Sequence, residues 1–188
     1  MKRVIILHGT CGSPEGNWFR WLEGELKRRG LEVWLPELPN AKQPRLSVWR
    51  DFIIQNLPFE PDGETLIVGH SSGAILAQIV AQSLPRPVGA TVCVSVFKDN
   101  SLGWEPNDHL FDVDFDFPAI KNNAGQLVYI HSDDDPYCPL EQPRYLHART
   151  GGELILIPGQ GHFNLEKSSD YKQFPRLLKI MKERDLLV

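Results

Sequence analysis

The chain alternates short apolar runs with segments of helical periodicity, and this alternation constrains its fold more than any other feature. Apolar residues at successive positions are typical of parallel strands that are buried on both faces and joined by crossover helices. The sequence therefore predicts an α/β fold with a mostly parallel, six-stranded sheet between two layers of helices. The predicted strands are residues 3–7, 31–35, 65–69, 89–97, 126–130 and 153–157. The predicted helices are residues 17–30, 46–57 (with Ser47 as its cap), 72–84, 140–149 and 171–184.

Length and charge narrow the class of protein. A chain of 188 residues, of which 41% are hydrophobic, is expected to fold as one domain over residues 1–188. A net charge of -4 argues against a nucleic-acid partner, which would favour clustered lysine and arginine. The first apolar run, residues 4–7, is far shorter than a signal peptide or a membrane span, and three cysteines do not suggest a disulfide framework. We therefore expect a cytoplasmic protein with no membrane span.

The segment GHSSG at residues 69–73 joins a predicted strand to a predicted helix and fits the pattern G-x-S-x-G. In that pattern a tight elbow lifts the central serine above the carboxyl edge of a parallel sheet. Gly69 and Gly73 are needed because a Cβ at either position would clash with neighbouring chain. The pattern predicts that Ser71 is a catalytic nucleophile. The alternative is an ordinary strand-to-helix turn in which Ser72 caps the helix.

A serine nucleophile needs a general base, and in this kind of fold the base follows both the serine and an acid along the chain. That order leaves His147 and His162 as candidates. His147 lies within a helical pattern, where a surface histidine is the simpler interpretation. His162 lies just past the last predicted strand in the segment GQGHF, whose glycines allow a loop to turn back over the elbow. We therefore predict that His162 is the base.

The acid should follow the preceding strand, where the chain reads SDDDPYCP at residues 132–139. Three consecutive aspartates cannot all face one histidine. Asp135 precedes Pro136 and should be extended, but the spacing alone leaves Asp134 as a rival. A solvated acidic turn with no catalytic role is the remaining alternative.

The oxyanion formed when a serine attacks a carbonyl needs backbone N–H donors. The residue after the nucleophile, Ser72, is expected to supply one of them, and Thr10 in the loop HGTCG is expected to supply the other. A phosphate cradle is disfavoured in this loop, because it contains neither G-x-G-x-x-G nor G-K-[ST].

The segments GHSSGAI, SDDDPYCP and GQGHFN together resemble the nucleophile, acid and base motifs of the small, cofactor-free α/β-hydrolases related to retinoblastoma-binding protein 9 and YdeN. NWFRWLEGEL and LSVWRDFI are similar to the first two helices of that family. The resemblance covers essentially the whole chain and implies that Asp135 is the acid. It also implies no large cap domain, and the expected strand order is 2-1-3-4-5-6. The Leu-x-Cys-x-Glu motif for retinoblastoma-type pocket proteins is missing, so that partner is not expected and no protein partner is predicted.

Residues 98–118 have no clear period and are long for a connection, which often marks a functional loop. Its alternating aspartates do not form a calcium loop, because Phe117 stands where glycine is required. This segment and Trp104 either roof an acyl pocket or form a separate apolar cluster. We expect Cys11, Trp104 and Phe163 to contact substrate, with Cys11 a small buried side chain rather than a regulatory thiol.

These features together predict a serine hydrolase that cleaves an ester, thioester or amide of a small molecule or peptide through an acyl-enzyme. Esterase activity is the general expectation, and peptidase activity is the alternative within the same chemistry. The sequence implies neither a metal nor an organic cofactor. The competing class is a binding or scaffold protein that keeps the fold with an idle site.

Overall fold

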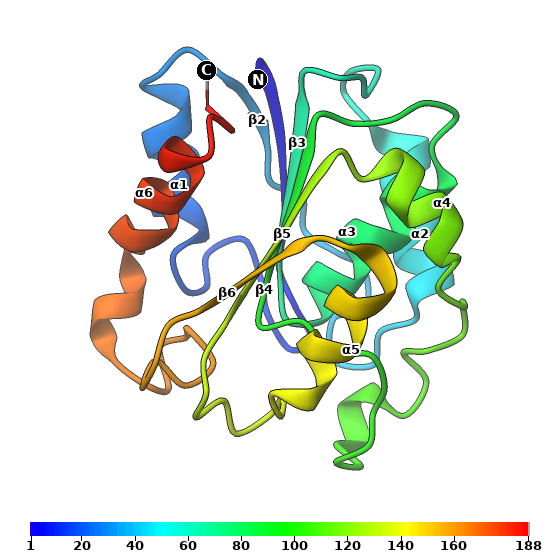
Figure 1. The fold of residues 1–188 in the computed structure, drawn as a ribbon, viewed down its shortest axis with the longest axis vertical. Coiled ribbons are helices and arrows are strands. Elements are labelled where there is room, and N and C mark those ends of the chain that lie inside the picture. Colours follow the sequence, from blue (N-terminus) through cyan, green and yellow to red (C-terminus); the bar gives the residue numbers. More distant parts are fainter. Residues whose placement is uncertain (188) are drawn as a thin grey trace.

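The six predicted strands form one parallel sheet in the computed structural model, which describes residues 1–187. The order β2-β1-β3-β4-β5-β6 confirms the predicted order, and every neighbouring pair runs parallel (Figure 1). The strands are β1 (Arg3–Leu7), β2 (Glu32–Trp34), β3 (Thr65–His70), β4 (Ala90–Val94), β5 (Gln126–His131) and β6 (Glu153–Leu156). The helices are α1 (Phe19–Lys27), α2 (Leu46–Asn56), α3 (Ser72–Ser83), α4 (Phe117–Asn123), α5 (Glu141–Thr150) and α6 (Pro175–Glu183), with short 3-10 turns η1 (Glu105–Asn107) and η2 (Ser169–Lys172).

Helices cover both faces of the sheet, as the continuous apolar runs predicted. In Figure 1, α1 and α6 lie on one side of the strands, and α2, α3, α4 and α5 lie on the other. Each residue of β3 is buried, and alternate residues enter opposite apolar clusters: Ile67 packs on the α3 side, while Leu66 and Val68 pack on the α1 and α6 side. Two cores therefore hold the central strands, and the loops at their carboxyl ends start from fixed positions.

Three local predictions differ from the structure. Helix α2 begins at Leu46, so Ser47 is not its cap; its backbone N–H and its hydroxyl both donate to Asp112. Helix α4 was not predicted, and it starts where Asp116 caps the N–H of Ala119. The last predicted helix is divided into η2 and α6, because Pro175 opens a new helix at its first turn.

The carboxyl ends of the parallel strands lie at one edge of the sheet, at the bottom of Figure 1, and five of the loops that leave this edge bear on the site. These loops follow β1, β3, β4, β5 and β6 and carry the predicted site residues. This edge is where α/β folds place their ligands. Within residues 1–187, none of the helices is both long and apolar enough to cross a membrane.

Candidate active site

The elbow at Ser71 has the strained geometry that the sequence predicted. Ser71 has φ 57° and ψ -128°, and its N–H donates to the carbonyl of Val94 at 2.9 Å, which ties the elbow to β4. A Cβ added to Gly69 would lie 2.2 Å from the carbonyl oxygen of Gly73, and one added to Gly73 would lie 2.3 Å from the carbonyl oxygen of His8. Both glycines are therefore required sterically, and the strain is concentrated at Ser71, the predicted nucleophile.

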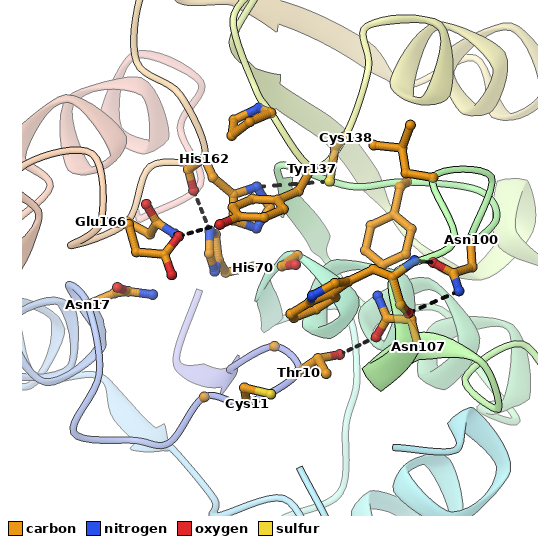
Figure 2. A pocket seen from close by; sticks show the side chains of 18 of the residues that line it. Thr10, Cys11, Asn17, His70, Asn100, Asn107, Tyr137, Cys138, His162 and Glu166 are labelled. Atoms are coloured by element: carbon orange, nitrogen blue, oxygen red, sulfur yellow. Dashed lines mark hydrogen bonds between the residues drawn. The ribbon is translucent and has the colours of Figure 1, made fainter. Parts of the chain in front are cut away.

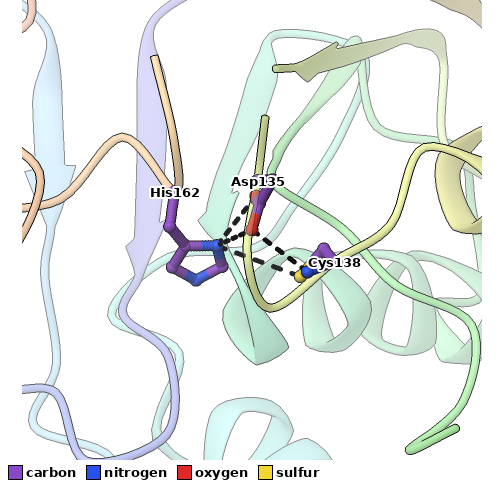
Figure 3. Close-up of side chains that lie close together, drawn as sticks. All are labelled: Asp135, Cys138 and His162. Atoms are coloured by element: carbon purple, nitrogen blue, oxygen red, sulfur yellow. Dashed lines mark hydrogen bonds and ion pairs between the residues drawn. The ribbon is translucent and has the colours of Figure 1, made fainter. Parts of the chain in front are cut away.

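His162 and Asp135 form a buried pair at this edge of the sheet, as Figure 3 shows. The Nδ1–H of His162 donates to the carboxylate of Asp135, with Nδ1 at 3.0 and 2.9 Å from its two oxygens. Burial acts to raise the pKa of Asp135, but the hydrogen bond and charge of His162 outweigh it and the pKa is lowered. Since Nδ1 carries its proton toward Asp135, Nε2 is left as the basic nitrogen.

The other two aspartates of the DDD segment bind the loop that carries His162. Asp133 accepts the N–H of Gly159 at 2.9 Å, and Asp134 accepts the N–H of Gly161 at 2.6 Å. The second oxygen of Asp134 lies 2.8 Å from the ammonium of Lys167, and this hydrogen bond is the main reason that the pKa of Asp134 is lowered. Asp134 therefore faces the loop backbone, and only Asp135 faces the imidazole.

Buried histidines at the strand ends support the site, and the sequence reasoning missed their role. The Nε2–H of His70 donates to the carbonyl of His162 at 2.7 Å, and burial lowers the pKa of His70 to about 3. The Nε2–H of His131 donates to the carbonyl of Cys138 at 2.7 Å, and burial lowers its pKa as well. Both rings are thus held neutral. The signal in the sequence was that a histidine closes β3 and another closes β5, next to the loops that they hold.

The two residues predicted to bind the oxyanion lie together but already bond to each other. The N–H of Thr10 donates to the hydroxyl of Ser72 at 2.6 Å. The Thr10 hydroxyl also contacts the Ser72 hydroxyl, at 2.7 Å, and donates to Asn107 at 2.7 Å. Ser72 is the first residue of α3, where backbone N–H groups have no partner within the helix. The oxyanion assignment stays a prediction, and for Thr10 it requires that the arriving oxyanion replace the Ser72 hydroxyl.

A cavity of about 530 Å³ opens beside the elbow and is lined by both Ser71 and His162 (Figure 2). Trp104 lines it, as predicted, together with neighbouring residues of the aperiodic segment from 99 to 107. Farther along that segment, Phe111 and Phe115 instead pack against the core. The first half of this segment therefore lines the cavity, and the second half joins the main core rather than forming a separate apolar cluster.

The remaining expectations about the cavity are partly wrong. Cys11 lines the cavity, but it is exposed rather than buried. Phe163 does not contact the cavity: its side chain is fully buried in the core, with ring centroids 5.2 Å from Phe174 and 5.9 Å from Tyr171. The physical reason is the turn at this residue, whose φ of 51° sends the ring away from the side on which His162 lies.

One group of potential metal ligands was found among the described residues, namely Asp135, Cys138 and His162, whose ligand atoms lie within 4.8 Å of one another (Figure 3). The carboxylate already accepts the imidazole proton and the N–H groups of Tyr137 and Cys138. Burial raises the pKa of the Cys138 thiol well above its usual range, whereas a metal binds the thiolate. The chemistry of this donor set fits a hydrogen-bonded acid and base better than a metal site.

Comparison with known proteins identifies the family and the fold of the chain. The serine hydrolase family matches residues 4–183. The chain is 30% identical to YdeN of Bacillus subtilis (strain 168) over 166 residues, 86% of each chain, and 27% identical to the serine hydrolase RBBP9 of Rattus norvegicus over 184 residues, 95% of each chain. The crystal structure of the ydeN gene product superposes with a TM-score of 0.88 at 25% identity, covering 97% of this chain and 98% of that one. Est1E of Butyrivibrio proteoclasticus, solved with ferulic acid, shares the fold with a TM-score of 0.70 at 17% identity, covering 99% of this chain and 88% of that one.

Proposed function

Since this chain belongs to the serine hydrolase family, we propose that it cleaves a carboxylic ester, thioester or amide through an acyl-enzyme on Ser71. The observation that carries the proposal is the convergence of three elements on one cavity. Ser71, on a strained elbow, and His162 both line this cavity. Asp135 accepts the Nδ1 proton of His162 on the side away from the cavity. This arrangement fits a nucleophile, a general base and an orienting acid.

In the proposed reaction the Ser71 hydroxyl attacks the substrate carbonyl while Nε2 of His162 takes its proton. The resulting oxyanion lies near the amino end of α3, where the N–H of Ser72 and the helix dipole both favour negative charge. The imidazolium then gives its proton to the departing alcohol, thiol or amine, leaving the acyl group on Ser71. Water attacks that ester with His162 again as the base, and Ser71 is regenerated.

Two neighbouring groups, His70 and Asp135, favour a single positive charge on His162 during this cycle. The pKa of His70 is lowered by burial and by the nearby His162, so His70 stays neutral while His162 becomes an imidazolium. The buried Asp135 carboxylate is the charge that stabilises that imidazolium. Esters are the first class to test, because an alcohol leaves more readily than an amine.

Labelling with a fluorophosphonate probe tests the proposal directly. Intact mass and peptide mapping should find one adduct on Ser71 in the wild-type protein and none in Ser71→Ala. Ser83→Ala, at the far end of α3, is the matched control and should label normally. If the folded wild-type protein is not labelled, or if Ser71→Ala is labelled equally, then Ser71 is not the nucleophile and a binding role for this fold becomes the better interpretation.

A further inference from the structure

The mouth of the cavity carries an exposed apolar surface. Eight large hydrophobic side chains are exposed among the described residues, and four of them line this cavity. They are Leu102 and Trp104 from the loop after β4, Tyr137 from the loop after β5, and Leu165 from the loop after β6. Apolar side chains that converge from three separate loops on a polar reaction centre mark a surface built to contact an apolar group.

Two aromatic rings lie against each other at this mouth, and hydrogen bonds hold the backbone of one and the hydroxyl of the other. The centroids of Trp104 and Tyr137 lie 5.9 Å apart, with their planes 38° from each other. Asn100 accepts the N–H of Trp104 at 3.0 Å and donates to its carbonyl at 3.1 Å. Tyr137 contacts the ring of His162, with centroids 5.1 Å apart, and its hydroxyl donates to Glu166 at 2.7 Å (Figure 2). The Tyr137 ring, which is held by these contacts, can therefore pack on a bound group at a smaller cost in entropy.

Two acidic side chains line the cavity, beside the histidines His70 and His162. Asp99 and Glu166 line it, and the lining residues that the structure describes include neither lysine nor arginine. Burial acts to raise the pKa of Asp99, but hydrogen bonds from Gln142, Lys98 and Ser101 lower it to about 2, so Asp99 is ionised. Glu166 raises the pKa of Tyr137, which therefore remains an uncharged phenol.

From these observations we propose that the cavity takes uncharged esters with an apolar, preferably aromatic, group and rejects esters that carry a carboxylate. A substrate carboxylate that entered the cavity would lose water, find no cationic partner among the lining residues, and be repelled by Glu166, whereas the charge of Asp99 is already paired with Lys98. A site can reject one class of substrate by placing a charge of the same sign where the substrate's charge would bind. This inference rests on the proposed hydrolysis at Ser71.

The test uses two esters that differ in one charge, methyl 4-acetoxybenzoate and 4-acetoxybenzoate, with each rate corrected for spontaneous hydrolysis. The wild-type protein should show a kcat/KM at least about tenfold higher for the neutral ester. Glu166→Gln keeps an oxygen to accept the Tyr137 hydroxyl, and it should raise the ratio of kcat/KM for the anionic ester to kcat/KM for the neutral ester about three- to tenfold.

Glu64→Gln is the matched control, because it changes the net charge equally but lies before β3, at the opposite end of the sheet. It should leave the ratio of the two rates unchanged. Trp104→Ala should raise KM for the neutral ester more than it lowers kcat, and Trp104→Phe should restore most of the loss.

Equal rates for the two esters, or an equal effect of Glu166→Gln on both, would overturn the inference. Fluorophosphonate labelling of the same preparation separates the two levels of failure. If Ser71 is labelled but the esters are not distinguished, only the substrate class is wrong. If Ser71 is not labelled and neither ester is hydrolysed, then the proposed function is wrong and the substrate class falls with it.

Discussion

Replacing Asp135 by asparagine should stop the proposed reaction while leaving the shape of the site intact. The side chain of Asp135 is fully buried, and its Oδ1 accepts the N–H groups of Tyr137 and Cys138, both at 3.0 Å. An asparagine oxygen would take this position because only an acceptor satisfies two donors. The amide NH₂ would then replace Oδ2, which lies 2.9 Å from Nδ1 of His162.

That exchange forces the wrong tautomer on His162. Facing an NH₂ donor, Nδ1 must become the acceptor, so the ring proton moves to Nε2 and the base can no longer accept the proton of Ser71. A wrong tautomer in a triad of this kind lowers kcat by about 10⁴-fold. This factor corresponds to about 5.5 kcal/mol in activation free energy.

Asp134→Asn is the matched control, because it makes the same change one residue earlier. Oδ1 of Asp134 accepts from both Ser132 and Gly161 at 2.6 Å, and an asparagine oxygen would preserve both bonds. The ion pair with Lys167 would be lost, but both side chains are about 40% exposed. Such a pair contributes about 0 to 1 kcal/mol, so kcat should fall by no more than about fivefold.

The assay is kcat and KM for methyl 4-acetoxybenzoate at pH 7, with circular dichroism and thermal unfolding to show that each variant is folded. KM should change little in either variant, because neither carboxylate lines the cavity. The reasoning would be refuted if Asp134→Asn lost as much activity as Asp135→Asn, or if Asp135→Asn kept more than about a tenth of the wild-type kcat.

Two further predictions follow from buried groups. The pKa of His70 is lowered to about 3, so between pH 7 and pH 5 the unfolded chain binds a proton that the folded chain does not, and the free energy of unfolding should fall by about 2 kcal/mol through this residue. In His70→Gln, urea titrations should show a fall in the free energy of unfolding between pH 7 and pH 5 that is smaller by this amount. An unchanged fall would contradict the lowered pKa of His70. Cys11 is exposed while burial raises the pKa of Cys93 and Cys138, so DTNB should titrate one thiol in the native protein and three in guanidinium. Fast reaction of a second thiol in the native protein would refute the predicted burial.

The sheet and the elbow were predictable because local rules determine them. Runs of apolar residues identified all six strands, and the parallel alternation with helices predicted both covered faces. The steric demand at Gly69 and Gly73 follows from the elbow itself, since the clashing atoms belong to the same elbow or to the adjacent end of β1. The strands and the elbow depend on residues that are close in the sequence or on the order of the strands, and the pattern of apolar residues indicates both.

The walls of the cavity were much less predictable, because the direction of a loop side chain depends on single backbone angles. Phe163 follows His162 directly, yet its positive φ sends the ring into the core. Tyr137 and Glu166 are 29 residues apart and were not singled out, although their hydrogen bond forms part of the cavity mouth. No pattern in the sequence encodes a contact between the tips of two loops.

The three consecutive aspartates could not be distinguished from the local sequence, and only contacts between two loops separate them. Spacing left Asp134 and Asp135 open, since both follow the same strand and either could reach a histidine. The structure separates them through a contact between two loops: Ser132, Asp133 and Asp134 accept the N–H groups of Gln160, Gly159 and Gly161 respectively, which leaves Asp135 opposite His162. The first three contacts fix the register of the base loop and the fourth orients the imidazole. The segment SDDD therefore acts as a unit, in which the partners of the first three residues, rather than any local pattern, place the proposed acid Asp135 beside His162.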